Sequence, residues 1–185
     1  MWAVRTVDTK NREDQCSGTR YAVELTRGGK PVPGIESDRI SGIEERVMEW
    51  DSATHIHGWF VDNVQNGKDD FRKHTVSIQD LRQLLETCEK VLNGSQLVLE
   101  KPYKADDWYL DHERMHAEGK PSRVIKNLSV AYRLLPTKGG YKDTSARYDE
   151  AYLKDVEATR DWAERMLRDI ERGLSCTIHY HSSSW

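Results

Sequence analysis

The clearest local fold signal lies in Ser77-Ile-Gln-Asp-Leu-Arg-Gln-Leu-Leu-Glu-Thr-Cys-Glu-Lys-Val-Leu-Asn-Gly94. Ser77 and Asp80 have the spacing of an N-terminal capping box, with aspartate in place of the usual glutamate or glutamine. Apolar residues then recur every three or four positions, which gives one apolar helix face. Asn93-Gly94 is typical of a helix end. These signals predict an amphipathic helix over residues 78–92.

Two longer helices are expected on either side of this one. The first is predicted to run from Ser41 toward Gln65, because Ser41 and Glu44 have capping-box spacing and apolar residues follow at helical intervals. The second is predicted over residues 149–172. Gly58 lies inside the first helix and costs on the order of 1 kcal/mol relative to alanine. A glycine kept in such a place often allows close approach by another backbone or a ligand.

The strand signals are shorter than the helix signals and come mainly from alternating apolar residues. Gly28-Gly29 is typical of a hairpin turn with a return strand at residues 30–32. The remaining strands are expected at residues 1–7, 21–25, 97–99, 123–135 and 176–181, the last as an edge strand. The prediction is therefore an α+β fold with about three main helices packed on a small, mostly antiparallel sheet. We expect the chain to form a single domain over residues 1–185, with an insertion at about residues 97–131.

Composition narrows the function classes without choosing one. The chain has 185 residues, of which 37% are hydrophobic and 32% are charged, with a net charge of −3. This balance lacks the basic footprint of a duplex nucleic-acid binder. No apolar run approaches the ~18 residues of a membrane helix. Three widely spaced cysteines favour a reducing compartment. We therefore expect a cytoplasmic protein with neither membrane nor duplex partner.

Residues 112–116 read His-Glu-Arg-Met-His and so satisfy the H-E-x-x-H pattern. On a helix His112 and His116 share one face and can bind one zinc ion, while Glu113 activates a water molecule. Ser122 stands where the longer version of this motif has its third histidine. A zinc-dependent hydrolase is therefore one hypothesis, and an exposed polar helical turn is the simpler interpretation. No other cofactor is indicated.

Three segments carry a resemblance to a known family. Residues 50–65 fit W-x-x-A-x-x-I-H-x-W-F-V-x-x-x-Q, residues 134–137 read Leu-Leu-Pro-Thr, and residues 148–152 read Tyr-Asp-Glu-Ala-Tyr. In this order they resemble a family of small accessory proteins encoded by tailed phages and prophages. The similarity covers residues 47–93 and 134–170, whereas the first 40 residues and the 97–131 stretch depart from the family pattern.

The resemblance implies a biological context and not an activity. Accessory phage proteins often counteract host defence, some by sequestering nucleotide immune signals and others by binding a host protein directly. We therefore expect a non-enzymatic protein that captures a nucleotide-type ligand without cleaving it, in the cytoplasm of an infected bacterium. An inhibitor of a host protein is the alternative, and a zinc hydrolase is the second. Such ligand traps are commonly homo-oligomers, although the chain has no interface signature.

The expected ligand site combines stacking rings with hydrogen-bonding groups from the matched segments. For His57, which lies on the apolar stripe beside Gly58, the other interpretation is a core histidine hydrogen-bonded to backbone or to aspartate. The candidate ligand-binding residues are Trp50, His57, Trp59, Asn63, Gln65, Thr137 and Tyr141.

Overall fold

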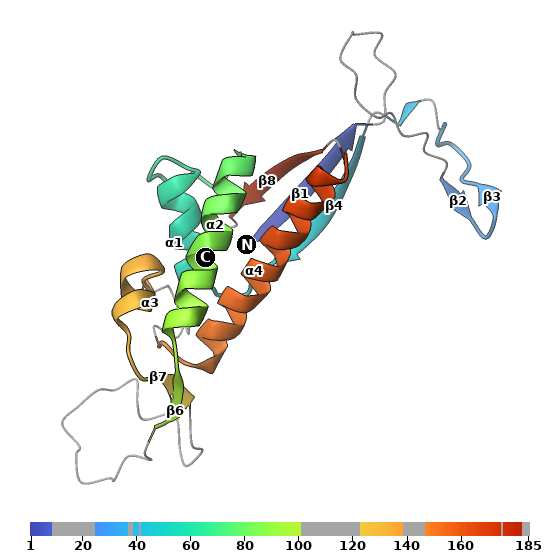
Figure 1. Ribbon diagram of the computed structural model, residues 1–185. Coiled ribbons are helices and arrows are strands. Elements are labelled where there is room, and N and C mark those ends of the chain that lie inside the picture. Colours follow the sequence, from blue (N-terminus) through green and yellow to red (C-terminus); the bar gives the residue numbers. More distant parts are fainter. Residues whose placement is uncertain are drawn as a thin grey trace.

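The computed structural model has an antiparallel sheet with helices on one of its faces, so the fold is α+β as predicted (Figure 1). The structure describes residues 1–8, 25–36, 39–40, 42–100, 123–138, 147–174 and 176–182. None of the helices in these ranges has the length and apolar content needed to cross a bilayer.

The main sheet has four strands in the order β4-β1-β8-β5, and every neighbouring pair is antiparallel. In that order the strands are Gly42–Glu49, Trp2–Asp8, Thr177–His181 and Lys73–Val76. The first and last strands of the described chain therefore lie side by side in the centre of the sheet, and their pairing fixes its register from Trp2 opposite His181 to Thr6 opposite Thr177.

Two short ladders lie outside the main sheet. Strands β2 (Thr26–Arg27) and β3 (Lys30–Pro31) form the hairpin predicted around Gly28-Gly29, whose positive φ angles of 62° and 75° suit glycine. Strands β6 (Leu97–Leu99) and β7 (Arg123–Ile125) pair within the expected insertion. Residues 101–122, including the His-Glu-Arg-Met-His stretch, lie outside the described residues.

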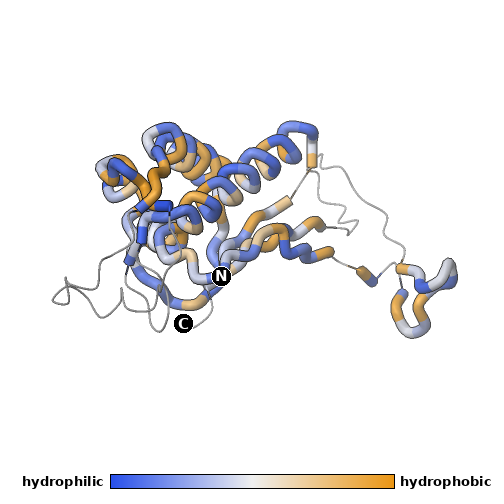
Figure 2. Tube along the Cα trace, turned by 90° about the horizontal axis from the view of Figure 1, so that it is seen from below, coloured by the Kyte–Doolittle hydropathy of each residue, from blue (hydrophilic) through white to orange (hydrophobic). Residues whose placement is uncertain are grey.

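Four helices occur in the described residues: α1 (Thr54–Asn63), α2 (Ile78–Gly94), α3 (Ser129–Leu134) and α4 (Glu150–Glu171). The long helices α2 and α4 pack against each other, and α3 contacts α2. Figure 2 shows the helices gathered on one side of the strands. The predicted capping box of α2 is confirmed, because the Ser77 hydroxyl accepts from the backbone N–H of Asp80 and the Asp80 carboxylate accepts from that of Ser77.

The predicted helix from Ser41 to Gln65 is wrong over its first part. Residues 42–49 form strand β4, which pairs with β1 along its whole length. Ser52, with φ of 57°, turns the chain sharply before α1 begins. Backbone pairing with a distant strand therefore overrides the helical spacing of the apolar residues, as tertiary contacts often do.

Two other predictions also need correction. The strand expected over residues 123–135 ends after three residues, because Asn127 accepts a hydrogen bond from the backbone N–H of Ser129 at the start of α3. The C-terminal strand exists as β8, but it is an interior strand between β1 and β5 and not an edge strand.

An aromatic cluster ties the sheet to the helices. The ring of Phe60 in α1 stacks on Tyr180 in β8 at a centroid distance of 4.0 Å. Trp50, at the end of β4, meets Trp162 of α4 edge-on at 5.4 Å. The Trp50 indole N–H donates to the hydroxyl of Thr159 at 2.7 Å, so this buried polar group is satisfied. The cluster joins α1, α4 and two strands into one core.

The crossing of α2 and α3 requires glycine at position 94. A Cβ atom added to Gly94 would lie 2.9 Å from a methyl carbon of Val130. We expect Gly94→Ala to lower the free energy of unfolding by about 1–3 kcal/mol, because this overpacking exceeds the gain in helix propensity. Urea denaturation measures the change. Adding Val130→Ala should recover part of the loss, whereas two independent, additive losses would contradict a direct contact.

Candidate functional site

A small pocket lies between α1 and the segment formed by α3 and the residues after it. Its volume is about 150 Å³. The α1 residues that line it stand three or four positions apart and so share one helix face. The complete lining is His55, Gly58, Trp59, Asp62, Asn63, Arg133, Leu134, Pro136 and Lys138.

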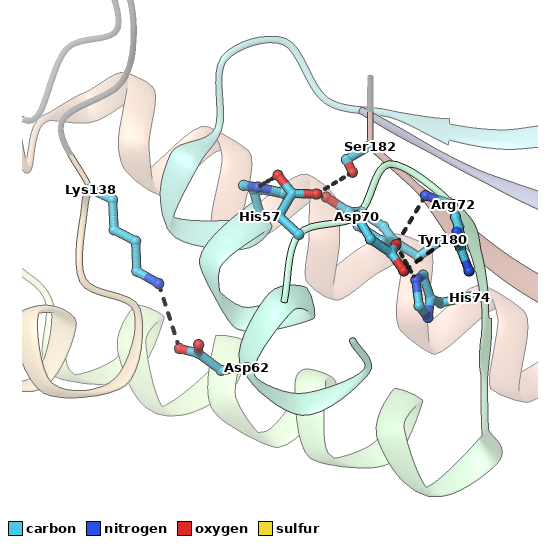
Figure 3. Close-up of polar contacts among 9 residues, drawn as sticks. His57, Asp62, Asp70, Arg72, His74, Lys138, Tyr180 and Ser182 are labelled. Carbon is cyan, nitrogen blue, oxygen red and sulfur yellow. Dashed lines mark hydrogen bonds and ion pairs between the residues drawn. The ribbon is translucent and has the colours of Figure 1, made fainter. Parts of the chain in front are cut away.

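Gly58 lets a lysine side chain cross α1 closely. A Cβ atom on Gly58 would lie 3.2 Å from Cε and 3.4 Å from Nζ of Lys138. The close neighbour of this glycine is therefore a side chain, and not the backbone or ligand expected from the sequence. The Lys138 ammonium also lies 3.7 Å from a carboxylate oxygen of Asp62, and this ion pair is drawn in Figure 3. Both members of the pair are more than half exposed.

His55 contributes a buried polar ring to the pocket lining. The residue is only 4% exposed, and its ring lies 4.2 Å from that of Tyr152. Burial lowers the pKa of His55 to about 3, so the imidazole is neutral at pH 7. Its Nε2 atom has no hydrogen-bond partner among the described residues. A buried polar atom without a partner is costly to the stability of the fold.

The rim of the pocket carries two cations and one anion. Arg133 and Lys138 are exposed, and Asp62 is the single carboxylate of the lining. The amide of Asn63 is already engaged, because its Nδ2 donates to the carbonyl of Trp59 and its Oδ1 accepts from Gln83. The formal charge around the pocket is therefore positive, which favours a small anionic ligand.

His57 is not among the residues that line the pocket, and its ring belongs to a chain of hydrogen bonds. Its Nδ1 lies 2.7 Å from the Tyr180 hydroxyl and its Nε2 lies 2.9 Å from a carboxylate oxygen of Asp69. The hydroxyl of Ser182 donates to the other oxygen of Asp69 at 2.7 Å. Figure 3 draws His57 of α1 together with Tyr180 of β8 and Ser182, which follows β8.

These hydrogen bonds suit one tautomer of the neutral His57 ring. In that tautomer Nε2–H donates to the Asp69 carboxylate and Nδ1 accepts from the Tyr180 hydroxyl. Burial lowers the pKa of His57, and the carboxylate of Asp69 only partly opposes this. The geometry is that of a core histidine bonded to aspartate, the second of the two interpretations open from the sequence.

The structure brings two of the predicted ligand-binding residues, Trp59 and Asn63, to the pocket. Thr137 stands between two lining residues, and its backbone N–H donates to the hydroxyl of Tyr148. Trp50 is 3% exposed and belongs to the aromatic core. Gln65 is likewise 3% exposed, and neither atom of its side-chain amide has a partner within the described part of the chain.

The other predicted residues lie outside the described ranges. These are Tyr141 and the proposed zinc residues His112, Glu113 and His116. Within the residues that the structure does describe, no group of three or more His, Cys, Asp or Glu side chains is placed to hold a metal ion.

Sequence reasoning missed the charged residues that define the pocket. Arg133 and Lys138 flank the Leu-Leu-Pro-Thr segment at 134–137, and this position beside a matched segment was the available signal. His55 shares the first turn of α1 with His57, but only the fold shows which of the two imidazoles lines the pocket.

The fold and the pocket define an α+β protein with a small, positively charged recess on its helical side. Comparison with protein-family models, with curated proteins and with solved structures finds no match to this chain.

Proposed function

We propose that this protein is a non-catalytic binding module that captures a small nucleotide-type ligand through its phosphate. The observation that carries the proposal is a small pocket lined by two exposed cations, Arg133 and Lys138, and by a single carboxylate, that of Asp62. Guanidinium and ammonium groups are strong hydrogen-bond donors to phosphate oxygens. The resemblance to phage accessory proteins supplies the context, in which the captured molecule is a host immune signal in the bacterial cytoplasm.

The size of the pocket limits what enters it. Ligand pockets commonly have volumes of about 300–1,000 Å³, whereas this one has about 150 Å³. We therefore expect it to hold one end of the ligand, a phosphate with part of its sugar. The base would lie outside the pocket, across the surrounding surface.

Capture without cleavage agrees with the role of His57. A general base must reach the proton that it removes. The two ring nitrogens of His57 already hydrogen bond to Tyr180 and Asp69, and the ring is largely buried. In this proposal His57 therefore supports the fold, and the ligand is assigned to the pocket residues on the other face of α1.

Calorimetry with ADP-ribose and with cyclic dinucleotides tests this proposal. We expect Lys138→Ala to weaken binding about tenfold, because one charge-assisted hydrogen bond to phosphate contributes roughly 1.5 kcal/mol. Lys154→Ala is the matched control, since Lys154 is also exposed and also pairs with a carboxylate, that of Glu150. Equal affinities of the two variants for every nucleotide tested would remove Lys138 from the site.

An inhibitor of a host protein is the second candidate, and one observation favours it. Leu128 and Tyr132 stand four residues apart at α3, and they are 42% and 67% exposed. Exposed aromatic side chains are common anchors in protein interfaces. One host protein that co-purifies in equal amounts with the wild type, and no longer does so with Tyr132→Ala, would favour this candidate over nucleotide capture.

A further inference from the structure

One of the two cations that line the pocket, Lys138, is paired with a carboxylate of the protein itself, that of Asp62. The two residues come from different segments, since Asp62 lies on α1 and Lys138 follows α3. Their closest atoms are 3.7 Å apart, whereas the ion pair of Lys90 with Glu86 within α2 measures 2.6 Å. The pair is thus loose and open to solvent, and such pairs exchange partners at little cost.

The side chain of Lys138 also lies close to α1, beside Gly58. The methylene groups of Lys138 run along α1 at Gly58, with Cδ and Cε 3.5 Å and 3.2 Å from where a Cβ would stand. The pKa of His57 is lowered mainly by burial, and the charge of Lys138 adds a smaller effect in the same direction. Removing the charge of Asp62 should therefore release the ammonium without moving it away from the pocket.

We infer that Asp62 is an affinity-setting counter-ion that occupies Lys138 in the empty pocket and gives way to a ligand phosphate. The inference rests on the proposed function and specifies its ligand class as phosphate-bearing anions. Asp62 opposes such a ligand in two ways, because it competes for Lys138 and its own carboxylate repels the phosphate. A neutral ligand neither needs the charge of Lys138 nor is repelled by Asp62. Asp62 therefore selects ligands by their charge and not by their shape.

The test uses inorganic pyrophosphate as the probe and follows its binding by NMR titration. Asp62→Asn keeps the size of the side chain and removes its charge, so we expect pyrophosphate to bind three- to tenfold more tightly than to the wild type. Asp161→Asn is the matched control, because Asp161 is 59% exposed against 61% for Asp62 and pairs with an arginine on α4. We expect this control to bind like the wild type.

Salt separates an electrostatic role from a structural one. The increase in pyrophosphate affinity caused by Asp62→Asn should become smaller when the sodium chloride concentration rises from 0.05 M to 0.5 M, since salt screens exposed charges. Equal pyrophosphate affinities of the three proteins, no measurable binding by any of them, or a gain that ignores salt would each overturn the inference.

The proposed function can fail separately. If the wild type binds a nucleotide through Lys138 but Asp62→Asn changes nothing, only the role of Asp62 is wrong. If neither pyrophosphate nor any nucleotide binds the wild type, both the role of Asp62 and the capture function are wrong.

Discussion

Replacement of Phe60 by alanine should lower the free energy of unfolding by about 3–5 kcal/mol, the range for large aromatic residues in protein cores. Phe60 is fully buried. Its ring stacks on Tyr180 at 4.0 Å and lies 5.5 Å from the Trp50 ring and 6.4 Å from the Trp162 ring. Deleting it leaves a cavity among rings from α1, α4, β8 and the end of β4, which cannot all move to fill it.

The chain contains its own control, because Phe60 and Phe71 are its two phenylalanines. Phe71 is 48% exposed, so Phe71→Ala should change the stability by less than about 1 kcal/mol. Urea denaturation of both variants, monitored by tryptophan fluorescence, gives the comparison. Similar losses for the two variants would mean that the aromatic cluster is not the main core.

Acid should destabilise the protein through His55. Burial lowers the pKa of His55 to about 3 in the folded protein, against 6.5 in the unfolded chain. Below pH 6.5 the unfolded chain binds the proton and the folded protein does not, so stability falls as the pH falls. Between pH 7.5 and pH 5 this contributes a loss of about 2 kcal/mol. The pKa of His57 is also lowered, which adds a loss of the same sign.

Asp155 opposes this trend. Burial, with the nearby carboxylates of Asp149 and Asp51, raises the pKa of Asp155 from 3.8 to about 6. Between those two values the folded protein binds the proton more readily than the unfolded chain, so acidification stabilises the fold. We expect this gain to be about 1 kcal/mol at pH 5, which is smaller than the loss from His55.

Two variants separate these contributions in urea denaturation between pH 7.5 and pH 4.5. His55→Gln removes the titrating imidazole, so its stability should fall less with acid than that of the wild type. Asp155→Asn removes the opposing carboxylate, so its stability should start higher at pH 7.5 and fall more steeply. Parallel pH curves for the wild type and His55→Gln would show that His55 does not titrate as its burial implies.

The sequence predicted correctly those helices and turns that are determined by residues close together in the chain. Helix α2 has its capping box at its own N-terminus and its apolar face within its 17 residues, and the β2–β3 hairpin has its turn glycines. Strand β4 was missed because its partner, β1, lies more than 30 residues away in the chain. The apolar residues of β4 also fit a helix, and no nearby residue decides between the two.

The pocket was only partly predictable for the same reason. Trp59 and Asn63 came from the matched segment on α1. Arg133 and Lys138 reach the same pocket only because α3 packs beside α2, a contact that depends on Gly94 and Val130. Trp50 was a candidate stacking ring for a ligand, but the fold uses that ring in its core.

Native mass spectrometry tests the central claim of nucleotide capture most directly. The purified protein would be sprayed alone and then with ADP-ribose and a set of cyclic dinucleotides, beside Lys138→Ala under the same conditions. We predict a mass increase of one nucleotide per pocket in the wild type and a much weaker increase in the variant. A wild-type chain that stays bare with every nucleotide, or an equal increase in both proteins, would contradict capture at this pocket.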